Sequence, residues 1–175
     1  MTLRDLLAQR APAERGRWLD AVLSEYGPVT AARWRSERDP FANPVGHALS
    51  TGLPALFAGV ASDRGPDERA LSALQEIVRI RSVQDLSPSR AIGFVLLLRR
   101  AVRQELAAEL AGGAHAEGLA DLDRRIEQLA LLAFDAYVAV REEMFRLRQE
   151  ELKRSVSSIL RRWNGGIVPD DPGMN

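Results

Sequence analysis

The segment from Leu119 to Trp163 constrains this chain most, because it contains neither proline nor glycine. Its apolar residues recur mainly at alternating spacings of four and three, the heptad pattern of helices that pack side by side. The members of this seam are Leu122, Ile126, Leu129, Ala133, Ala136, Val140, Met144 and Leu147. Two spacings of four meet at Val140, and such an extra step locally unwinds a left-handed supercoil. The pattern predicts one long helix whose seam residues form a dimer or partner interface.

A helix over 119–163 spans about 65 Å at 1.5 Å per residue. A compact domain of about 120 residues has a radius of gyration of only about 14 Å. The end of the helix must therefore project from the domain or fold back on it, and the sequence leaves both arrangements open. We expect 1–118 to form a helical bundle, 119–163 to complete the bundle and extend as a dimerisation or output helix, and 164–175 to form a flexible tail.

The rest of the chain also predicts helices, since no segment shows the sustained apolar–polar alternation of a strand. Proline is tolerated in the first turn of a helix, whose amides have no acceptor within the helix. Predicted helices accordingly begin at or near Pro12, Pro44, Pro66 and Pro88. The first is expected to run to about Tyr26 and the last to about Leu110, while Pro54 should kink or break the second. The predicted fold class is all-α, a helical bundle with a long C-terminal helix.

Composition excludes several classes of function. Lys plus Arg and Asp plus Glu are equal at 24 each, so the basic excess that grips nucleic acid is absent. Cysteine is absent, which excludes disulfides, thiolate metal sites and cysteine nucleophiles. No phosphate-binding glycine motif or serine-hydrolase motif occurs. No secretory signal or bilayer-length apolar run occurs either, so the sequence predicts a cytoplasmic, non-enzymatic protein without a metal or cofactor.

The two histidines are the candidates for a haem or metal ligand. His47 lies one turn into the helix that begins at Pro44, with no second histidine or close carboxylate at ligand spacing. It can be a haem or metal ligand or a proton-responsive switch, or it can be a helix residue that packs beside Phe41 or faces solvent. The missing partners argue against the ligand. His115 lies in a glycine-rich loop and is expected to be exposed.

Arg79 and Arg81 lie on a helix that must also bury one face. They can form an anion or ligand site, or ion pairs between helices, and the frequent pairing of partly buried arginine favours ion pairs. Asp85 follows Arg81 by four residues and can pair with it. Both interpretations require an acceptor for a buried Arg81, because an unpaired buried charge is costly.

Basic residues cluster near the end of the long helix, where a second and weaker apolar stripe follows the seam. The stripe consists of Leu152, Val156, Ile159 and Trp163. The basic residues are Arg146, Arg148, Lys153, Arg154, Arg161 and Arg162, opposed by Glu150 and Glu151. This stretch can contact a membrane surface or an acidic partner. It can also be the solvated flank of a coiled coil, which we favour.

Two segments resemble a known family. Phe41–Val45 (FANPV) and Glu76–Ala91 (EIVRIRSVQDLSPSRA) are similar to the N-terminal helical domain of RsbR-type co-antagonist proteins, and more narrowly to its RsbRD branch. The resemblance spans roughly residues 3–150. It implies a sensory domain that is globin-like but lacks haem, and the corresponding stretch 76–86 here has no histidine. It also implies a dimer paired through the last helix, and a helical linker to a STAS-class output domain within large stress-signalling assemblies.

We therefore expect a homodimeric sensor that signals through its C-terminal helix to a separate protein partner. The chain stops at Asn175 without a STAS domain, so we expect a stand-alone sensor or adapter, or an output domain supplied by another chain. Two alternatives stay open. One is a helical carrier that binds a small molecule or haem, and the other is an adapter on a membrane-associated complex.

Overall fold

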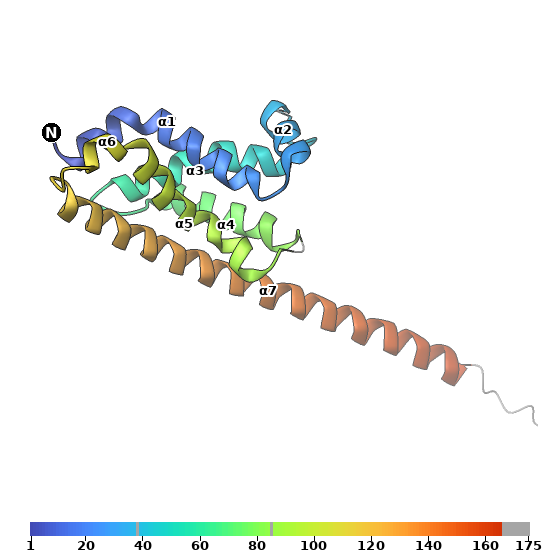
Figure 1. Cartoon of the computed structure of the whole chain (residues 1–175). Coiled ribbons are helices and arrows are strands. Elements are labelled where there is room, and N and C mark those ends of the chain that lie inside the picture. Colours follow the sequence, from blue (N-terminus) through green and yellow to red (C-terminus); the bar gives the residue numbers. More distant parts are fainter. Residues whose placement is uncertain (38, 85, 166–175) are drawn as a thin grey trace, which may run out of the picture. The chain divides into compact units, whose positions relative to one another are not determined.

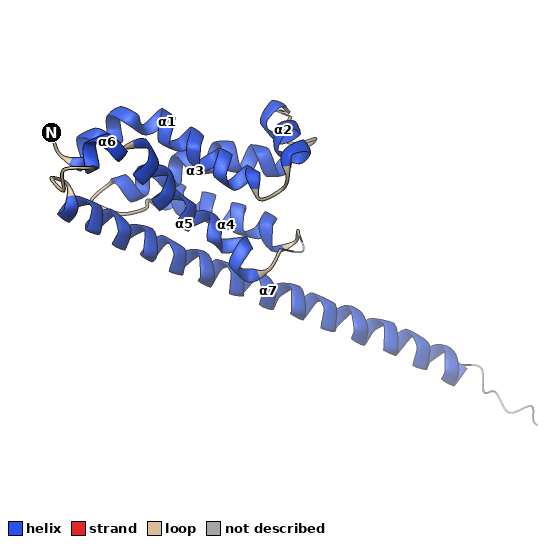
Figure 2. Cartoon of the chain, in the orientation of Figure 1, coloured by secondary structure: helices blue, strands red, loops and turns tan. Residues whose placement is uncertain are grey.

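The structure is a computed structural model that describes residues 1–37, 39–84 and 86–165. These residues form helices and no strand, as the secondary-structure colouring of Figure 2 shows. The helices are α1 (Leu3–Ser24), α2 (Pro28–Ser36), α3 (Pro44–Ala61), α4 (Glu68–Ser82), α5 (Pro88–Glu105), α6 (Ala107–Leu110) and α7 (Ala116–Gly165). The prediction of an all-α fold with a long C-terminal helix is confirmed.

The chain divides into two compact units, Met1–Val138 and Ala139–Asn175. The first unit contains α1 to α6 and the beginning of α7, and the second contains the remainder of α7. From Ala116 to Gly165 this helix is longer at both ends than the predicted 119–163. The rest of the predicted tail, from Gly166 onward, lies outside the described residues. Within the described part of the chain, no helix combines the length and the apolar character needed to cross a bilayer.

The core of the first unit forms where α1 packs against α3 and α5, and α3 packs against α4 (Figure 1). Trp18 of α1 is completely buried, and its indole Nε1 donates a hydrogen bond to the backbone carbonyl of Phe94 in α5 at 2.7 Å. The two rings stack with their centroids 6.4 Å apart. This contact satisfies the one polar group of Trp18 and joins two helices through a large apolar surface.

The first helix begins at Leu3, so the predicted start at Pro12 is wrong. Thr2 and Asp5 form a capping box, in which the Thr2 hydroxyl accepts from the Asp5 amide at 3.2 Å and the Asp5 carboxylate accepts from the Thr2 amide at 2.8 Å. Pro12 lies inside the helix on its exposed side. Water can there bond the carbonyl of Ala8 that Pro12 leaves without a donor.

The other helix boundaries follow their caps. Asn43 caps α3, its side-chain oxygen accepting from the amide of Gly46 at 2.8 Å, and Ser87 caps α5, as predicted. Pro54 does not end α3, which continues to Ala61. The short helix α2 was not expected, because a glycine followed by a proline, here Gly27 and Pro28, usually ends a helix. Gly27 instead adopts a φ of 83°, which reverses the chain and lets Pro28 open a new helix.

Two further boundaries differ from the expected ones. The helix expected near Pro66 begins at Glu68, with Asp67 as its cap. The helix expected to reach Leu110 ends at Glu105, and the separate turn α6 follows.

Glu14 is a buried acid that sequence reasoning did not single out. Its side chain is completely buried in α1, and neither carboxylate oxygen has a hydrogen-bond partner. Burial raises the pKa of Glu14 to about 8, and the negative charge of Glu105 acts in the same direction. Arg10 and Arg17 flank Glu14 on the same helix, yet both form ion pairs with Glu105 of α5. Leu7, Trp18 and Val22 form an apolar stripe that passes through position 14. This stripe was the sequence signal from which the burial of Glu14 could have been predicted.

Replacing Glu14 by glutamine should stabilise the protein increasingly as the pH rises. The folded-state pKa of Glu14 lies above its ordinary value of 4.5, so the native chain retains a proton that the unfolded chain has lost. Native stability therefore falls between pH 4.5 and about 8 relative to Glu14→Gln. We expect a gain of about 2–4 kcal/mol at pH 8 and almost none near pH 4, measured by urea denaturation. An equal gain at both pH values, or the same gain in the exposed control Glu117→Gln, would contradict this account.

Candidate functional site

The first half of the predicted α7 seam packs inside the first unit. The side chains of Leu122, Ile126, Leu129 and Ala133 are at most 3% exposed and belong to the hydrophobic core. Because they are buried, these residues offer no surface to a second chain. Apolar spacings of four and three occur both in coiled coils and in helices that pack on their own domain. The remaining seam residues differ in exposure. Ala136, Val140 and Met144 are partly exposed, and Leu147 is 52% exposed.

A different side of α7 exposes apolar residues in the first unit. Leu131 and Phe134 are 66% and 49% exposed, and Leu96 of α5 is 49% exposed. Ion pairs place these residues close together. Arg103 pairs with Asp123, and Arg99 pairs with both Asp123 and Glu127 at 3.0 and 2.8 Å.

These pairs show that α5 and α7 run antiparallel in the first unit, so Leu96, one turn before Arg99, lies near Leu131, one turn after Glu127. We call Leu96, Leu131 and Phe134 the α5–α7 patch. Exposed apolar groups of this kind mark interaction sites more often than scattered single residues do.

The second unit exposes a longer apolar stripe. Its members are Phe145, Leu152, Val156, Ile159 and Trp163, which are 54–72% exposed. We call these five residues the C-terminal stripe. Four of these residues form the weaker stripe predicted from the sequence, and the structure adds Phe145, which lies seven positions before Leu152. An isolated helix gains no stability from side chains that stay in water, so the stripe is a candidate surface for another chain.

Arg81 lies inside the first unit, where its guanidinium group bonds several groups of the chain. Its side chain is 1% exposed, and Nη2 bonds the Glu25 carboxylate at 2.6 Å. Nη1 donates to the Tyr26 hydroxyl at 2.6 Å, while Nε and Nη2 donate to the carbonyls of Ala91 and Arg90 at 3.1 and 2.6 Å. Four of its five donors are therefore used within the chain. The arrangement joins the end of α1 to α4 and to the beginning of α5.

Aromatic rings complete the surroundings of Arg81. The guanidinium carbon lies 5.2 Å from the ring centroid of Tyr26 and 5.5 Å from that of Phe94, within cation–π range. Burial raises the pKa of Tyr26, so its hydroxyl keeps the proton that it donates to Gln84 at 2.9 Å. Arg79 lies elsewhere, exposed and paired with Glu76 at 2.7 Å. The two arginines therefore do not share one anion site, and Asp85 lies outside the described residues.

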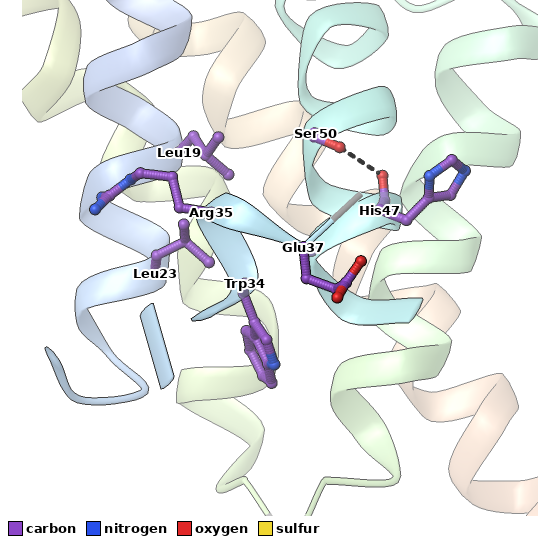
Figure 3. Close-up of a pocket in the computed structure, with 8 residues that line it drawn as sticks. Leu19, Leu23, Trp34, Arg35, Glu37, His47 and Ser50 are labelled. Carbon is purple, nitrogen blue, oxygen red and sulfur yellow. Dashed lines mark hydrogen bonds between the residues drawn. The ribbon is translucent and has the colours of Figure 1, made fainter. Parts of the chain in front are cut away.

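His47 borders a pocket of about 400 Å³ between α1, α2 and α3 (Figure 3). Its lining residues are Leu19, Leu23, Trp34, Arg35, Glu37, Gly46, His47 and Ser50. In Figure 3 Arg35 and His47 point away from one another. Arg35 pairs with Asp20 at 2.6 Å, and the Ser50 hydroxyl donates to the backbone carbonyl of His47 at 3.0 Å. The polar groups do not converge on one point, as they do in sites that orient a small ligand.

The described residues hold no cluster of three or more histidine, aspartate or glutamate side chains that could bind a metal ion. The imidazole of His47 is exposed at the surface of α3. His115 is partly exposed, and its carbonyl accepts from the amide of Leu119 at 2.9 Å, in the first turn of α7.

One comparison with known proteins finds a family. The model of the family described as the RsbT co-antagonist protein rsbRD N-terminal domain matches residues 12–152. The matched region covers most of the first unit and continues into the second. No curated protein and no solved structure matches the chain.

Replacing Arg81 by lysine should destabilise the first unit by about 3 kcal/mol, because an ammonium group cannot replace the forked bonds to Glu25, Tyr26 and two carbonyls. Arg79→Lys makes the same chemical change at an exposed position, and we expect less than about 0.5 kcal/mol there. Chemical denaturation of both variants measures the difference. Similar losses of stability at the two positions would show that Arg81 and its acceptors do not act as a clamp that holds α1, α4 and α5 together.

Proposed function

Because this chain belongs to the family of RsbRD N-terminal domains, we propose that it is a non-enzymatic sensor that passes its signal through α7 to a separate protein. Domains of this family are regulatory parts of stressosome co-antagonist proteins, and the family match supports a regulatory role. The observation that carries the proposal is the exposed apolar surface of α7. The match extends to residue 152, so the beginning of the second unit belongs to the region shared with the family.

We include homodimerisation in this proposal and assign it to the α5–α7 patch. The buried seam residues Leu122 to Ala133 cannot pair two chains without unfolding the core. Leu96, Leu131 and Phe134 can, since they present apolar area that gains about 25 cal/mol for each Å² removed from water. The partly exposed seam residues Ala136, Val140 and Met144, with Leu147, stay candidates for contact with a partner protein.

The proposal also includes a cytoplasmic location, a globin-like arrangement without haem, and the absence of a cofactor. The lack of convergent polar groups around His47 supports the last point. Arg81 supports it as well, because Glu25, Tyr26 and two backbone carbonyls already occupy the group that would bind an anion.

Leu131→Glu should convert a dimer into a monomer in a native mass spectrum, because it places a charge in the α5–α7 patch. The control is Leu132→Glu, the same change at an exposed neighbour about 100° further around the helix, outside the patch. We expect Leu132→Glu to stay dimeric. A monomeric unmodified chain, or equal effects of the two substitutions, would refute dimerisation through this patch.

Cutting the chain after Val140 should remove partner binding and leave the first unit folded, since Met1–Val138 forms a compact unit. Affinity capture with the full-length and shortened chains compares their partners, and circular dichroism with thermal melting checks the fold. A partner that the folded, shortened chain still captures would show that the signal does not leave through the end of α7.

A further inference from the structure

The C-terminal stripe has the spacing of a coiled-coil seam. Phe145 and Leu152 are seven residues apart, and the spacings to Val156, Ile159 and Trp163 are four, three and four. In heptad notation Phe145, Leu152 and Ile159 occupy position d, and Val156 and Trp163 occupy position a, whereas the two earlier a positions carry the polar residues Glu142 and Gln149. All five side chains are exposed. The stripe is therefore apolar at each d position and, from Val156 onward, at the a positions as well, which suits packing against one partner helix.

The positions beside this seam are basic on both sides. Heptad positions g and e flank an a/d seam and choose the partner through their charges. In the second unit Arg141 and Arg148 occupy g, and Arg146 and Lys153 occupy e. The other flanking positions whose side chains are described carry Ala139, Ser155 and Leu160, so none is acidic.

A second copy of this chain fits the seam poorly. In a parallel pair each g residue faces the following e residue of the other helix, so Arg141 would face Arg146 and Arg148 would face Lys153. In an antiparallel pair g faces g and e faces e, which again brings only basic residues together. Like charges at these positions are destabilising. Arg146 pairs with Glu143 of its own helix at 2.7 Å. This pair does not neutralise Arg141, Arg148 or Lys153, which would still face basic residues of a second copy.

An anionic membrane also fits less well than a helix. Helices that lie on membranes bury a wide apolar face and carry basic residues on the rest. Here acidic residues interrupt the helix surface at Glu142, which lies in the seam, and at Glu143, Glu150 and Glu151 outside it. These carboxylates would be repelled by anionic headgroups, whereas a single helix on the seam would avoid most of them.

We propose that the C-terminal stripe binds an amphipathic helix of another protein whose own flanking positions are acidic. This inference rests on the proposed function, in which α7 transmits a signal to a separate protein, and it specifies the chemistry of that partner. Acidic side chains opposite Arg141, Arg146, Arg148 and Lys153 would form ion pairs across both edges of the seam. The same basic residues would repel those of a second copy of the chain, which supplies specificity.

The test uses the full-length chain and two synthetic helical peptides with identical leucine and valine seams. One peptide has glutamate at every e and g position, and the other has lysine. Neither peptide pairs well with itself, so each is free to bind. We expect the glutamate peptide to bind at least about tenfold more tightly in a fluorescence anisotropy titration, with an advantage that shrinks as salt rises.

Matched variants show which charges are responsible. Arg148→Glu with Lys153→Glu reverses two flanking charges, and we expect the preference to shift to the lysine peptide. Arg154→Glu with Arg161→Glu makes the same change in net charge at exposed positions away from the seam, and we expect the preference to persist. Leu152→Glu should abolish binding of both peptides. All five positions are exposed, so the variants should fold like the unmodified chain.

Three results would overturn the inference. The first is equal affinity for both peptides or a preference for the lysine peptide. The second is self-association of the full-length chain that Leu152→Glu removes. The third is sedimentation with phosphatidylserine vesicles that Leu152→Glu removes, without a peptide preference.

The proposed function and the inference about the acidic partner helix can fail independently of each other. If the chain shortened after Val140 keeps its partner while the peptide preference holds, the signalling route is wrong and the acidic-helix surface stands. If the shortened chain loses its partner but no peptide preference appears, the route stands and the partner chemistry is wrong.

Discussion

The first unit depends on a buried positive charge that must be neutralised where it lies. Arg81 donates hydrogen bonds to Glu25 and Tyr26 after α1, and to the carbonyls of Arg90 and Ala91 at the start of α5. These groups are far apart in sequence, so their meeting determines how α1, α4 and α5 approach one another. An arginine left in this position without its acceptors would cost several kcal/mol. The segment Glu76–Ala91 that resembles the RsbRD family contains both the arginine and its two carbonyl acceptors, so the resemblance covers residues that close this clamp.

Around this clamp the structure uses the faces of α7 for different tasks. One face, from Leu122 to Ala133, is buried in the first unit, where it stabilises the core. Another exposes Leu131 and Phe134, and in the second unit the C-terminal stripe is exposed. A helix can carry such separate faces because its side chains point outward in all directions around the axis. The division matters for function, since a face buried in the core cannot also pair two chains.

The sequence predicted much of the fold and little of the site. Asn43 and Ser87 were identified as caps because a short polar side chain before a proline can accept from the free amides of the first turn. The start of α1 was missed because Pro12 drew more weight than the capping pair Thr2 and Asp5. The acceptor of Arg81 could not be predicted, since Glu25 lies more than fifty residues away and local spacing pointed to Asp85 instead.

The sequence by itself determined the helical class, the long uninterrupted α7 and the absence of thiol chemistry, because these follow from local periodicity and from the residue types present. Tertiary structure decided which apolar stripe is core and which is surface, because both stripes satisfy the same spacing rule and only the packing of α1 to α5 chooses between them. It also decided that Glu14 is buried without a partner and that Arg81 is buried with several. Burial depends on what other segments place around a side chain, and no local pattern contains that information.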